Sequence, residues 1–573
     1  MKNKKIIVFV ISILILVAGY LYYYVINDVE ITEGSQLMTK NYEWNSIISD
    51  IFNNSEPSFE VDGKSIKLDS DELYMNNSLS MMINSDKIRH IFSCAVNVYN
   101  KENIIIEKSN IKLSLSVKRP GIVINGNYQD SGETVVVEND KIYVPLSIFG
   151  DYLSYDYKWD YKANKIQLSN LKPNEKVYPH AYDYRTDGRI VRVKDQKDLG
   201  TCWAFASLTA LETSLMNKYT YDFSEDHMSC HNGYNLKQTE GGDYNMSMAY
   251  LSSWRGPVFE KEDPYGDGVS PDGLSSAVHV QEMQIIESKD LDGIKRAVFL
   301  YGGVQSSLYM SMSDSYGNDS EAYNSKTSSY CYIGNEKANH DVVIVGWDDH
   351  YEASNFATVP EGDGAFICVN SWGEQFGDKG YFYVSYYDSG IGMHNLVYTG
   401  IESVNNYDKI YQSDICGWVG QLGYNREYAY FSNVYTAKND EILSAVGFYA
   451  TDSGTSYEIY VVENYLDESS FGEKRKVVSG SFANAGYYTV KIPDEIIIPA
   501  GNDFAVIVYI NTPSSVKPIA IECRGDYSTS TVDITDGRGY ISLNGVRWEH
   551  VEESQRCNVC LKAYTVNTKD LKG

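Results

Sequence analysis

Basic residues and cysteines are scarce in this sequence of 573 residues, and each shortage excludes a class of protein. Only 49 lysines and arginines stand against 77 aspartates and glutamates, which gives a net charge of -28. A surface this negative repels phosphate backbones, so nucleic acid is excluded as a partner. Nine cysteines are too few and too scattered for a disulfide framework, and none precedes Cys94, so a lipoprotein cleavage signal is absent. Most of these thiols are expected to be buried.

The overall composition is that of a globular protein. With 43% hydrophobic and 22% charged residues, the chain is neither disordered, nor collagen-like, nor a polytopic membrane protein. Its length predicts several folded domains rather than one core. Phenylalanine is infrequent at 18 residues, whereas tyrosine reaches 50. This excess of tyrosine favours β-rich extracellular modules. In their strands, a half-buried tyrosine packs its ring against the core and keeps its hydroxyl group in water.

The amino-terminal residues 1–28 predict a membrane signal-anchor or a signal peptide. Residues 6–25 are uncharged and mostly apolar, which is about the length that spans a hydrocarbon core of ~30 Å. Lysines precede this run and acidic residues follow it, so the amino terminus is expected in the cytoplasm and the rest of the chain outside. The only small-residue cleavage candidate lies inside the run. The sequence therefore predicts an extracellular protein at the cell surface, anchored by a single pass or secreted after signal cleavage.

Residues 56–170 form a β-patterned segment that contains a weak internal repeat. Residues 92–108 align without gaps on residues 153–169, and each copy reads as a short helix followed by strand, turn and strand. The second copy, KIYVPLSIFGDYLSYDYKWDYKANKIQL, resembles the copper amine oxidase N-terminal-like module, a small α+β domain of Gram-positive surface proteins. That resemblance implies no copper and no oxidase activity. The segment has no Cys/His cluster with ligand spacing, so a spacer or wall-associated module is the expected role.

Chemistry is concentrated in residues 171–401, where helix-compatible runs precede strands. In the segment DQKDLGTCWAFA, Cys202 opens an apolar helix on which Trp203, Ala206, Ala210 and Leu211 share a face. Free N–H groups and the macrodipole at a helix amino terminus favour an anion, so this position favours the thiolate that attacks carbonyls. Gln196 precedes Cys202 in a loop. Its amide and the Cys202 N–H could together form an oxyanion hole.

A nucleophilic thiol needs a base, and one histidine has the required setting. Of the nine histidines, only His340 precedes an uninterrupted buried-strand pattern, DVVIVGW. Asn370 ends another apolar strand, AFICVN, and could hold the imidazole without adding negative charge. Trp372 follows two residues later and could shield the Asn370–His340 hydrogen bond from water. Cys202, His340 and Asn370 are therefore the predicted catalytic residues.

The order Gln196, Cys202, His340, Asn370 resembles the papain-like cysteine peptidases. The match includes DYR, GTCWAF, NSWG and GYF in the expected order, and Gly241 with Gly242 at the position that contacts substrate backbone. The resemblance implies a two-lobed peptidase, with a helical lobe and a β-barrel-like lobe. It also implies that Gly242 lines the non-primed side of the cleft.

The carboxy-terminal residues 405–565 are short alternating strands separated by turns, which predicts a β-sandwich. They resemble the lectin-like domain that follows the peptidase in one bacterial branch of the family. The complete fold prediction is thus multidomain α+β. That branch matures other cell-wall proteins, so the implied partners are protein or peptide substrates and a cell-wall polymer or carbohydrate. No cofactor is predicted. A structural calcium ion in the lectin-like domain is expected by analogy, with no ligands assigned.

Several residues depart from the family pattern without removing a catalytic group. Leu199 stands where the family has a disulfide cysteine, so that bridge is missing. Lys197 replaces a glycine beside Gln196, and Asn339 precedes His340 where many plant members have aspartate. Glu240 precedes Gly241, where an acidic lip could favour basic or polar substrate residues.

Two readings compete with the peptidase. The first is a catalytically silent wall-binding or carbohydrate-binding adhesin, although a silent scaffold has no need for all four catalytic-type residues. The second is a wall-peptide amidase or a transglutaminase, which also place a cysteine at a helix start. A third reading does not concern the peptidase: the spacing of Cys557 and Cys560 could also form a metal-binding or redox-active turn. Because no second such pair exists, a buried thiol pair or a disulfide is the favoured interpretation.

Overall fold

The computed structural model describes residues 57–568, except for residues 70, 77–79, 93, 100–101, 109–110, 118, 125–126, 130–134, 140, 161–164, 171–178, 187–188, 190, 217–220 and 313–319. Contacts divide the chain into two units. The first comprises the residues up to Ile83 with Pro145–Pro173, and the second comprises Asn84–Val144 with Asn174–Gly573. The predicted membrane segment at residues 6–25 lies outside the described residues and stays a prediction. Within the described ranges, no helix is both long enough and apolar enough to cross a membrane.

The first unit is built around a small sheet with the order β12-β13-β1-β2. Its central strands β1 and β13 pair in parallel and place Phe59 opposite Ile166, both of them buried. Helix α4 and most of the β3–β4 hairpin belong to the same unit. The bounds are β1 (Ser58–Val61), β2 (Lys64–Ile66), β3 (Leu73–Met75), β4 (Met81–Asn84), α4 (Ser147–Tyr152), β12 (Tyr155–Asp160) and β13 (Lys165–Asn170).

The amino-terminal part of the second unit contains helix α3 (Ser85–Phe92) and an antiparallel sheet in chain order β5-β6-β7-β8-β9. The predicted repeat is confirmed at the level of secondary structure. The β5–β6 hairpin after α3 and the β12–β13 hairpin after α4 are the two copies, and both are antiparallel. The remaining bounds are β5 (Ala95–Tyr99), β6 (Asn103–Lys108), β7 (Ile111–Ser116), β8 (Arg119–Ile124), β9 (Asn127–Gln129), β10 (Val136–Glu138) and β11 (Lys141–Pro145).

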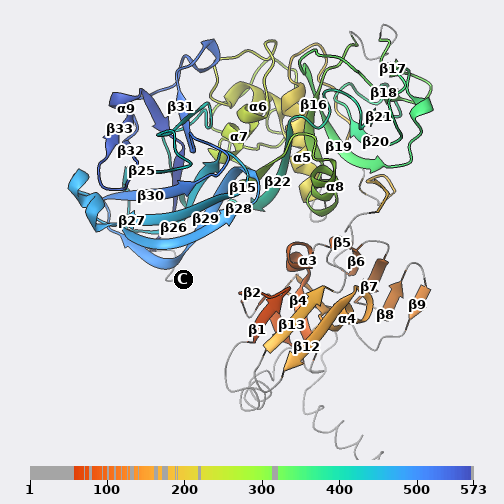
Figure 1. The fold of residues 1–573 in the computed structure, drawn as a ribbon, viewed down its shortest axis with the longest axis horizontal. Coiled ribbons are helices and arrows are strands. Elements are labelled where there is room, and N and C mark those ends of the chain that lie inside the picture. The colour runs from red at the N-terminus through yellow and green to blue at the C-terminus, as the bar shows by residue number, and fades with distance from the viewer. Residues whose placement is uncertain are drawn as a thin grey trace, which may run out of the picture. The chain divides into compact units, whose positions relative to one another are not determined.

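The central domain has a helical lobe beside a lobe of antiparallel strands (Figure 1). Helix α5 (Cys202–Leu215) runs through its core, and 12 of its 14 residues are buried. The residues expected to share an apolar face are all buried, and other elements cover the helix on nearly every other side as well. Strands β19 (His340–Asp348) and β20 (Ala365–Val369) are buried along their length, as their apolar runs predict, and they pair with each other.

The other helices of this domain are α6 (Glu225–His231), α7 (Tyr244–Ser252) and α8 (Leu291–Leu300). Its other strands are β14 (Ala181–Asp183), β15 (His279–Ile286), β16 (Val304–Leu308), β17 (Tyr323–Asn324), β18 (Ser329–Tyr330), β21 (Tyr381–Ser385) and β22 (Asn395–Glu402). They extend the β19–β20 pair into one sheet with the order β17-β18-β21-β20-β19-β16-β22-β15.

The carboxy-terminal domain has the two-layer β architecture that its turn spacing predicts. A six-stranded sheet, β28-β27-β30-β25-β32-β33, packs through a shared apolar core on strands β29, β26 and β35. The bounds are β23 (Lys409–Tyr411), β24 (Gly420–Leu422), β25 (Tyr428–Thr436), β26 (Glu441–Ala450), β27 (Thr455–Val462), β28 (Arg475–Phe482), β29 (Ala485–Ile498), β30 (Asp503–Asn511), β31 (Ile519–Cys523), β32 (Gly539–Ser542), β33 (Glu549–His550), α9 (Val551–Ser554), β34 (Cys557–Val559) and β35 (Leu561–Asn567).

The central and carboxy-terminal domains share one continuous sheet, which the sequence does not predict. Strand β15 of the central domain pairs on one side with β22 and on the other with β29, placing Met283 opposite Tyr487 (Figure 1). The order then continues through β26 and β35 to β23. Strand β29 therefore covers the edge of β15, and β15 covers the edge of β29, so neither strand is left as an exposed sheet edge.

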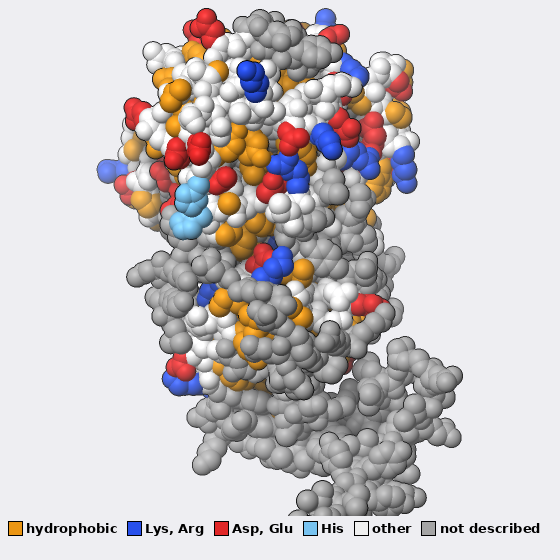
Figure 2. Space-filling view, turned by 90° about the vertical axis from the view of Figure 1, so that its right-hand side faces the viewer, with side chains coloured by type: hydrophobic (Ala, Val, Ile, Leu, Met, Phe, Trp, Pro, Cys, Tyr) orange, Lys and Arg blue, Asp and Glu red, His pale blue; other side chains and the backbone are white. Residues whose placement is uncertain are grey.

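The thiols and the surface charges agree with the composition argument. All nine cysteines are free, and six of them, including Cys557 and Cys560, are buried. Of the two interpretations left open for Cys557 and Cys560, the structure shows the buried thiol pair and not the disulfide. On the face drawn in Figure 2, lysine and arginine side chains are interspersed with acidic ones.

Candidate functional site

The predicted nucleophile lies at the first residue of a buried helix. Cys202 begins α5 and is partly buried. The preceding Thr201 does not cap the helix with its side chain, because its hydroxyl instead hydrogen-bonds the Tyr265 hydroxyl at 2.6 Å. The first intrahelical bonds to the Thr201 carbonyl come from residues 204 and 205. The Cys202 N–H therefore belongs to the helix-terminal N–H groups that have no intrahelical acceptor.

Gln196 is held in place by the segment that follows Asn370. The Gln196 N–H donates to the Ser371 carbonyl at 2.8 Å, and the Ser371 hydroxyl donates to Gln196 Oε1 at 2.6 Å. Gln196 Nε2 donates one hydrogen to the Leu199 carbonyl at 2.7 Å. These three bonds fix the orientation of the amide, and its second N–H stays available to a ligand.

The loop that carries Gln196 is anchored to α5 by a buried cation. Lys194 Nζ lies 2.9 Å from Glu212 Oε1 on α5 and 2.6 Å from Glu225 Oε1 at the start of α6. Glu212 and Glu225 are almost fully buried. A buried charge network of this kind fixes relative positions, because removing any one member leaves an uncompensated charge.

His340 and Asn370 are brought together from neighbouring strands. His340 Nε2 lies 2.7 Å from Asn370 Oδ1, and both side chains are buried. Because the amide oxygen accepts from Nε2, the Nδ1 nitrogen is left to exchange a proton with another group. The Trp372 ring lies 5.0 Å from the imidazole at an angle of 42°. This is the shielding position that the sequence predicts for Trp372.

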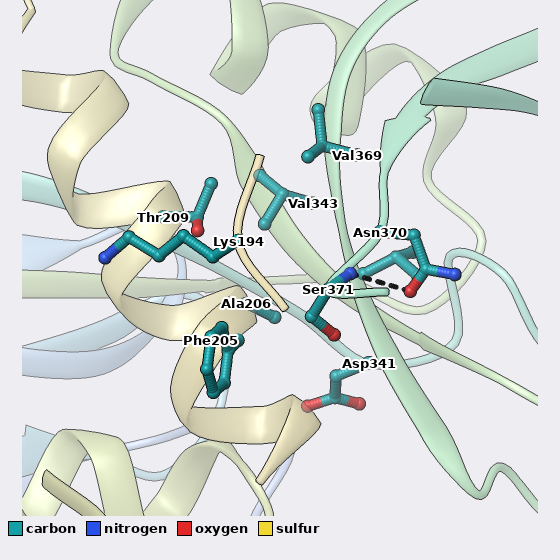
Figure 3. A pocket seen from close by; sticks show the side chains of 10 residues that line it. Lys194, Phe205, Ala206, Thr209, Asp341, Val343, Val369, Asn370 and Ser371 are labelled. Carbon is teal, nitrogen blue, oxygen red and sulfur yellow. Dashed lines mark hydrogen bonds between the residues drawn. The ribbon is translucent and has the colours of Figure 1, made fainter. Parts of the chain in front are cut away.

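The nucleophile and the base meet where α5 begins and β19 begins. The backbone N–H of Asp341, the residue directly after His340, hydrogen-bonds the Cys202 sulphur. Figure 3 shows the Asp341 carboxylate beside the amino-terminal end of α5, with Ser371 and Asn370 on the same side of the helix. A cavity of about 10 Å³ lies between the helix and these strands, about the size that one water molecule needs.

Burial opposes charge on both reacting groups. It raises the pKa of the Cys202 thiol to about 12, and the charge of Asp341 adds to this rise. Nearby backbone N–H groups lower that pKa, but by less. Burial also lowers the pKa of His340, whereas the hydrogen bond that His340 donates to Asn370 and the charge of Asp341 raise it. Desolvation therefore opposes the effect of the helix terminus, which favours the thiolate.

Gly241 and Gly242 are glycines for steric reasons. Gly241 has φ +82°, which side-chain-bearing residues rarely adopt. A Cβ on Gly242 would lie 2.6 Å from Nε1 of Trp203. Trp203 is fully buried and therefore supports the backbone of this turn from below. The turn is followed by Asp243, whose side chain caps α7 by accepting from the Asn245 N–H.

Sequence reasoning missed Asp341, Gln305, Ser371 and Tyr265. Ser371 lies within the NSWG motif, so its position next to Asn370 was visible although its bond to Gln196 was not. Asp341 could have been noticed as a carboxylate at the start of an otherwise apolar strand. Gln305 and Tyr265 give no sequence signal, because only the tertiary fold brings them to the site.

Three family models match separate parts of the chain. Residues 178–401 match the papain family cysteine protease, residues 410–565 match the lectin like domain, and residues 60–168 match the copper amine oxidase N-terminal domain. No group of three or more His, Cys, Asp or Glu side chains placed to hold a metal ion occurs within the part of the chain that the structure describes.

Individual relatives resemble one or two of these domains. Pro-cathepsin H of Bos taurus is 27% identical over 242 residues, which cover 41% of this chain and 68% of that protein. The structure of a clostridial cysteine protease, Cwp84, after propeptide cleavage matches with a TM-score of 0.61 and 28% identity, covering 68% of this chain and 99% of that one. A second structure contains the cysteine protease and lectin-like domains of Cwp84, a surface layer associated protein of Clostridium difficile. It matches with a TM-score of 0.58 and 26% identity over 68% of this chain and 89% of that one.

Proposed function

We propose that this chain, whose residues 178–401 form a papain-like cysteine peptidase domain, hydrolyses peptide bonds of surface or extracellular proteins, with Cys202 as nucleophile and His340 as base. One observation carries the proposal. The hydrogen bond between His340 and Asn370 fixes the imidazole beside the residue whose N–H contacts the Cys202 sulphur. A carboxamide, a buried imidazole and a helix-terminal thiol in this arrangement have the parts that acyl transfer requires.

In the proposed first step, the Cys202 proton passes to Nδ1 of His340 and the sulphur bonds to the substrate carbonyl carbon. Burial opposes both the thiolate of Cys202 and the imidazolium of His340, so neither charged group is favoured alone. As the proton moves, the two opposite charges must therefore stabilise each other. The developing oxyanion accepts from the Cys202 N–H and the second N–H of Gln196. His340 then gives the proton to the amine, the C–N bond breaks, and a thioester remains.

The proposed second step repeats this chemistry with water. His340 takes a proton from the water as its oxygen bonds to the thioester carbon, and the same N–H groups hold the oxyanion. The C–S bond then breaks and the proton returns to the sulphur. The products are a carboxylic acid and an amine, and the enzyme is restored without a cofactor.

The flanking domains support a location at the cell surface. The lectin-like match gives the chain a candidate binding module for a wall polymer or a carbohydrate. The matched Cwp84 is described as surface layer associated, and residues 6–25 predict a membrane anchor or signal. We infer that the peptidase acts on proteins close to the cell envelope.

A structural calcium ion in the lectin-like domain fits one group of oxygen atoms. Three side-chain oxygen atoms converge on one point beside Gly537, the point that a Cβ on this glycine would occupy. That point is 2.3 Å from Glu552 Oε1, 3.0 Å from Asn558 Oδ1 and 3.2 Å from Ser413 Oγ. The Asn558 and Ser413 oxygens are buried and have no hydrogen-bond partner. Calcium prefers carboxylate, amide and other oxygen ligands. We propose that these three side chains hold a calcium ion that stabilises the domain.

The peptidase is tested by labelling residues 28–573 with an epoxysuccinyl thiol inhibitor and measuring hydrolysis of a denatured protein. We expect one adduct, on Cys202, and loss of both the adduct and hydrolysis in Cys202→Ala. Absence of an adduct on folded, reduced protein, even after the segment before residue 177 is removed, would favour the adhesin. Turnover of muropeptide but not of protein would favour the wall-peptide amidase.

A further inference from the structure

A buried carboxylate lies directly beside the proposed nucleophile. Asp341 is only 7% exposed, and its Oδ2 accepts a hydrogen bond from Gln305 Nε2 at 2.8 Å. Among the residues that the structure describes, Asp341 has no lysine or arginine partner. Its charge acts on Cys202, on His340 and on Tyr244 at the start of α7. A buried aspartate is rarely left without a lysine or arginine partner, so its place beside the nucleophile requires an explanation.

Gln305 adds an unused acceptor next to this carboxylate. Its Nε2 is occupied by Asp341 and, at 3.3 Å, by the Trp203 carbonyl. Its Oε1 has no hydrogen-bond partner, although the side chain is only 1% exposed. An unsatisfied buried acceptor beside a carboxylate is an environment that favours a donor with positive charge.

A second carboxylate, Asp243, lies at the exposed amino-terminal end of α7. Its charge is close enough to Asp341 for the two to repel each other. Asp243 also has no lysine or arginine partner in the described part of the chain. Asp243 directly follows the Gly241–Gly242 turn, and Asp341 directly follows His340. A cation placed between the two carboxylates would relieve the repulsion.

We propose that Asp341 and Asp243, with Gln305 Oε1, select substrates that carry a lysine or arginine side chain on the amino-terminal side of the scissile bond. The inference rests on the proposed peptidase function and deepens it. The ammonium or guanidinium group donates to the Asp341 carboxylate and to Gln305 Oε1. The substrate backbone then lies along the Gly241–Gly242 turn, with its carbonyl at Cys202.

The test uses fluorogenic peptides that differ at one position at a time. At each of the three positions before the scissile bond, lysine is compared with norleucine and arginine with citrulline, because these pairs match in size and differ in charge. We expect kcat/KM to favour the charged member about tenfold or more at one position, as for a hydrogen-bonded partly buried charge pair. In Asp341→Asn, this ratio should fall to about one.

Two further variants separate selection from folding and from general charge. Asp243→Asn keeps a good helix cap and should reduce the ratio in part. Glu361→Gln removes an exposed acidic side chain elsewhere in the domain and should leave the ratio unchanged. All rates are normalised to the fraction of Cys202 that the epoxysuccinyl inhibitor labels.

The outcomes distinguish this inference from the proposed function. If labelled wild-type enzyme cleaves the charged and neutral peptides equally well, the inference is overturned and the peptidase stands. If the ratio survives in a folded Asp341→Asn, the selection comes from elsewhere and the inference is again overturned. If wild-type protein is neither labelled nor active, the proposed function itself fails.

Discussion

Replacing Asn370 by alanine tests whether the imidazole is held for catalysis. The substitution removes the 2.7 Å hydrogen bond to His340 Nε2 inside a buried site. A hydrogen bond to a charged group contributes about 1.5 to 3 kcal/mol, and the imidazole is charged in the reacting state. If the bond strengthens only in that state, kcat/KM should fall about 10- to 100-fold.

The same substitution predicts a pH shift of definite sign. The Asn370 hydrogen bond raises the pKa of His340, whereas burial lowers it. Without Asn370, the pKa of His340 should fall further, so the imidazolium loses its proton at a lower pH. Because His340 must be neutral to accept the Cys202 proton, the acidic limb of the kcat/KM profile should therefore move to lower pH. Asn370→Asp adds a negative charge and should move that limb to higher pH.

The assay is kcat/KM against pH with a fluorogenic peptide, normalised to titratable Cys202. Because Asn370 Oδ1 also accepts from the Ser371 N–H at 2.8 Å, loop damage needs a control. Ser371→Ala removes the hydroxyl bond to Gln196 without touching the imidazole, so it should lower kcat/KM and leave the acidic limb in place. An Asn370→Ala enzyme with kcat/KM within about twofold of wild type and an unmoved limb would refute the reasoning.

Three other predictions follow from the same structure. Gln196→Ala removes an oxyanion donor, so it should lower kcat about 100- to 1000-fold, as single-turnover rates would show. Because the thiol stays in place, the inhibitor should still label Cys202, which mass spectrometry measures. Gly242→Ala should raise KM more than it lowers kcat, since the added Cβ meets Trp203 Nε1 at 2.6 Å and displaces the substrate-contacting turn, as steady-state kinetics would show. Burial raises the pKa of Glu552 from 4.5 to about 7, so the folded domain holds the proton of Glu552 more tightly than the unfolded chain does. Without calcium, the folding stability that this proton contributes is fully present below pH 4.5 and should be lost as pH rises through 7. The expected loss in the free energy of unfolding is about 2 to 3 kcal/mol. Millimolar calcium should restore this stability in thermal unfolding, and Glu552→Gln should remove both the pH dependence and the calcium response.

The sequence predicts the local parts of this site better than their electrostatics. The buried strands β19 and β20 follow from apolar runs, and the structure joins His340 to Asn370 at their ends. The helix that begins at Cys202 follows from composition alone. Its burial on all sides does not, because covering elements come from distant parts of the chain. For the same reason, the burial that raises the pKa of Cys202 does not follow from its place at a helix terminus.

Non-local pairing also explains why the sequence does not predict that the central and carboxy-terminal domains share one sheet. The pattern of β15 and that of β29 each indicate a strand, but nothing in either pattern names the partner. In the structure, β29 covers the edge of β15 and continues the peptidase sheet into the lectin-like domain. The hydrogen bonds of this ladder make the relative position of the two domains part of the fold rather than of a linker. A ligand bound by the lectin-like domain would therefore set the orientation of the peptidase cleft as well as its location.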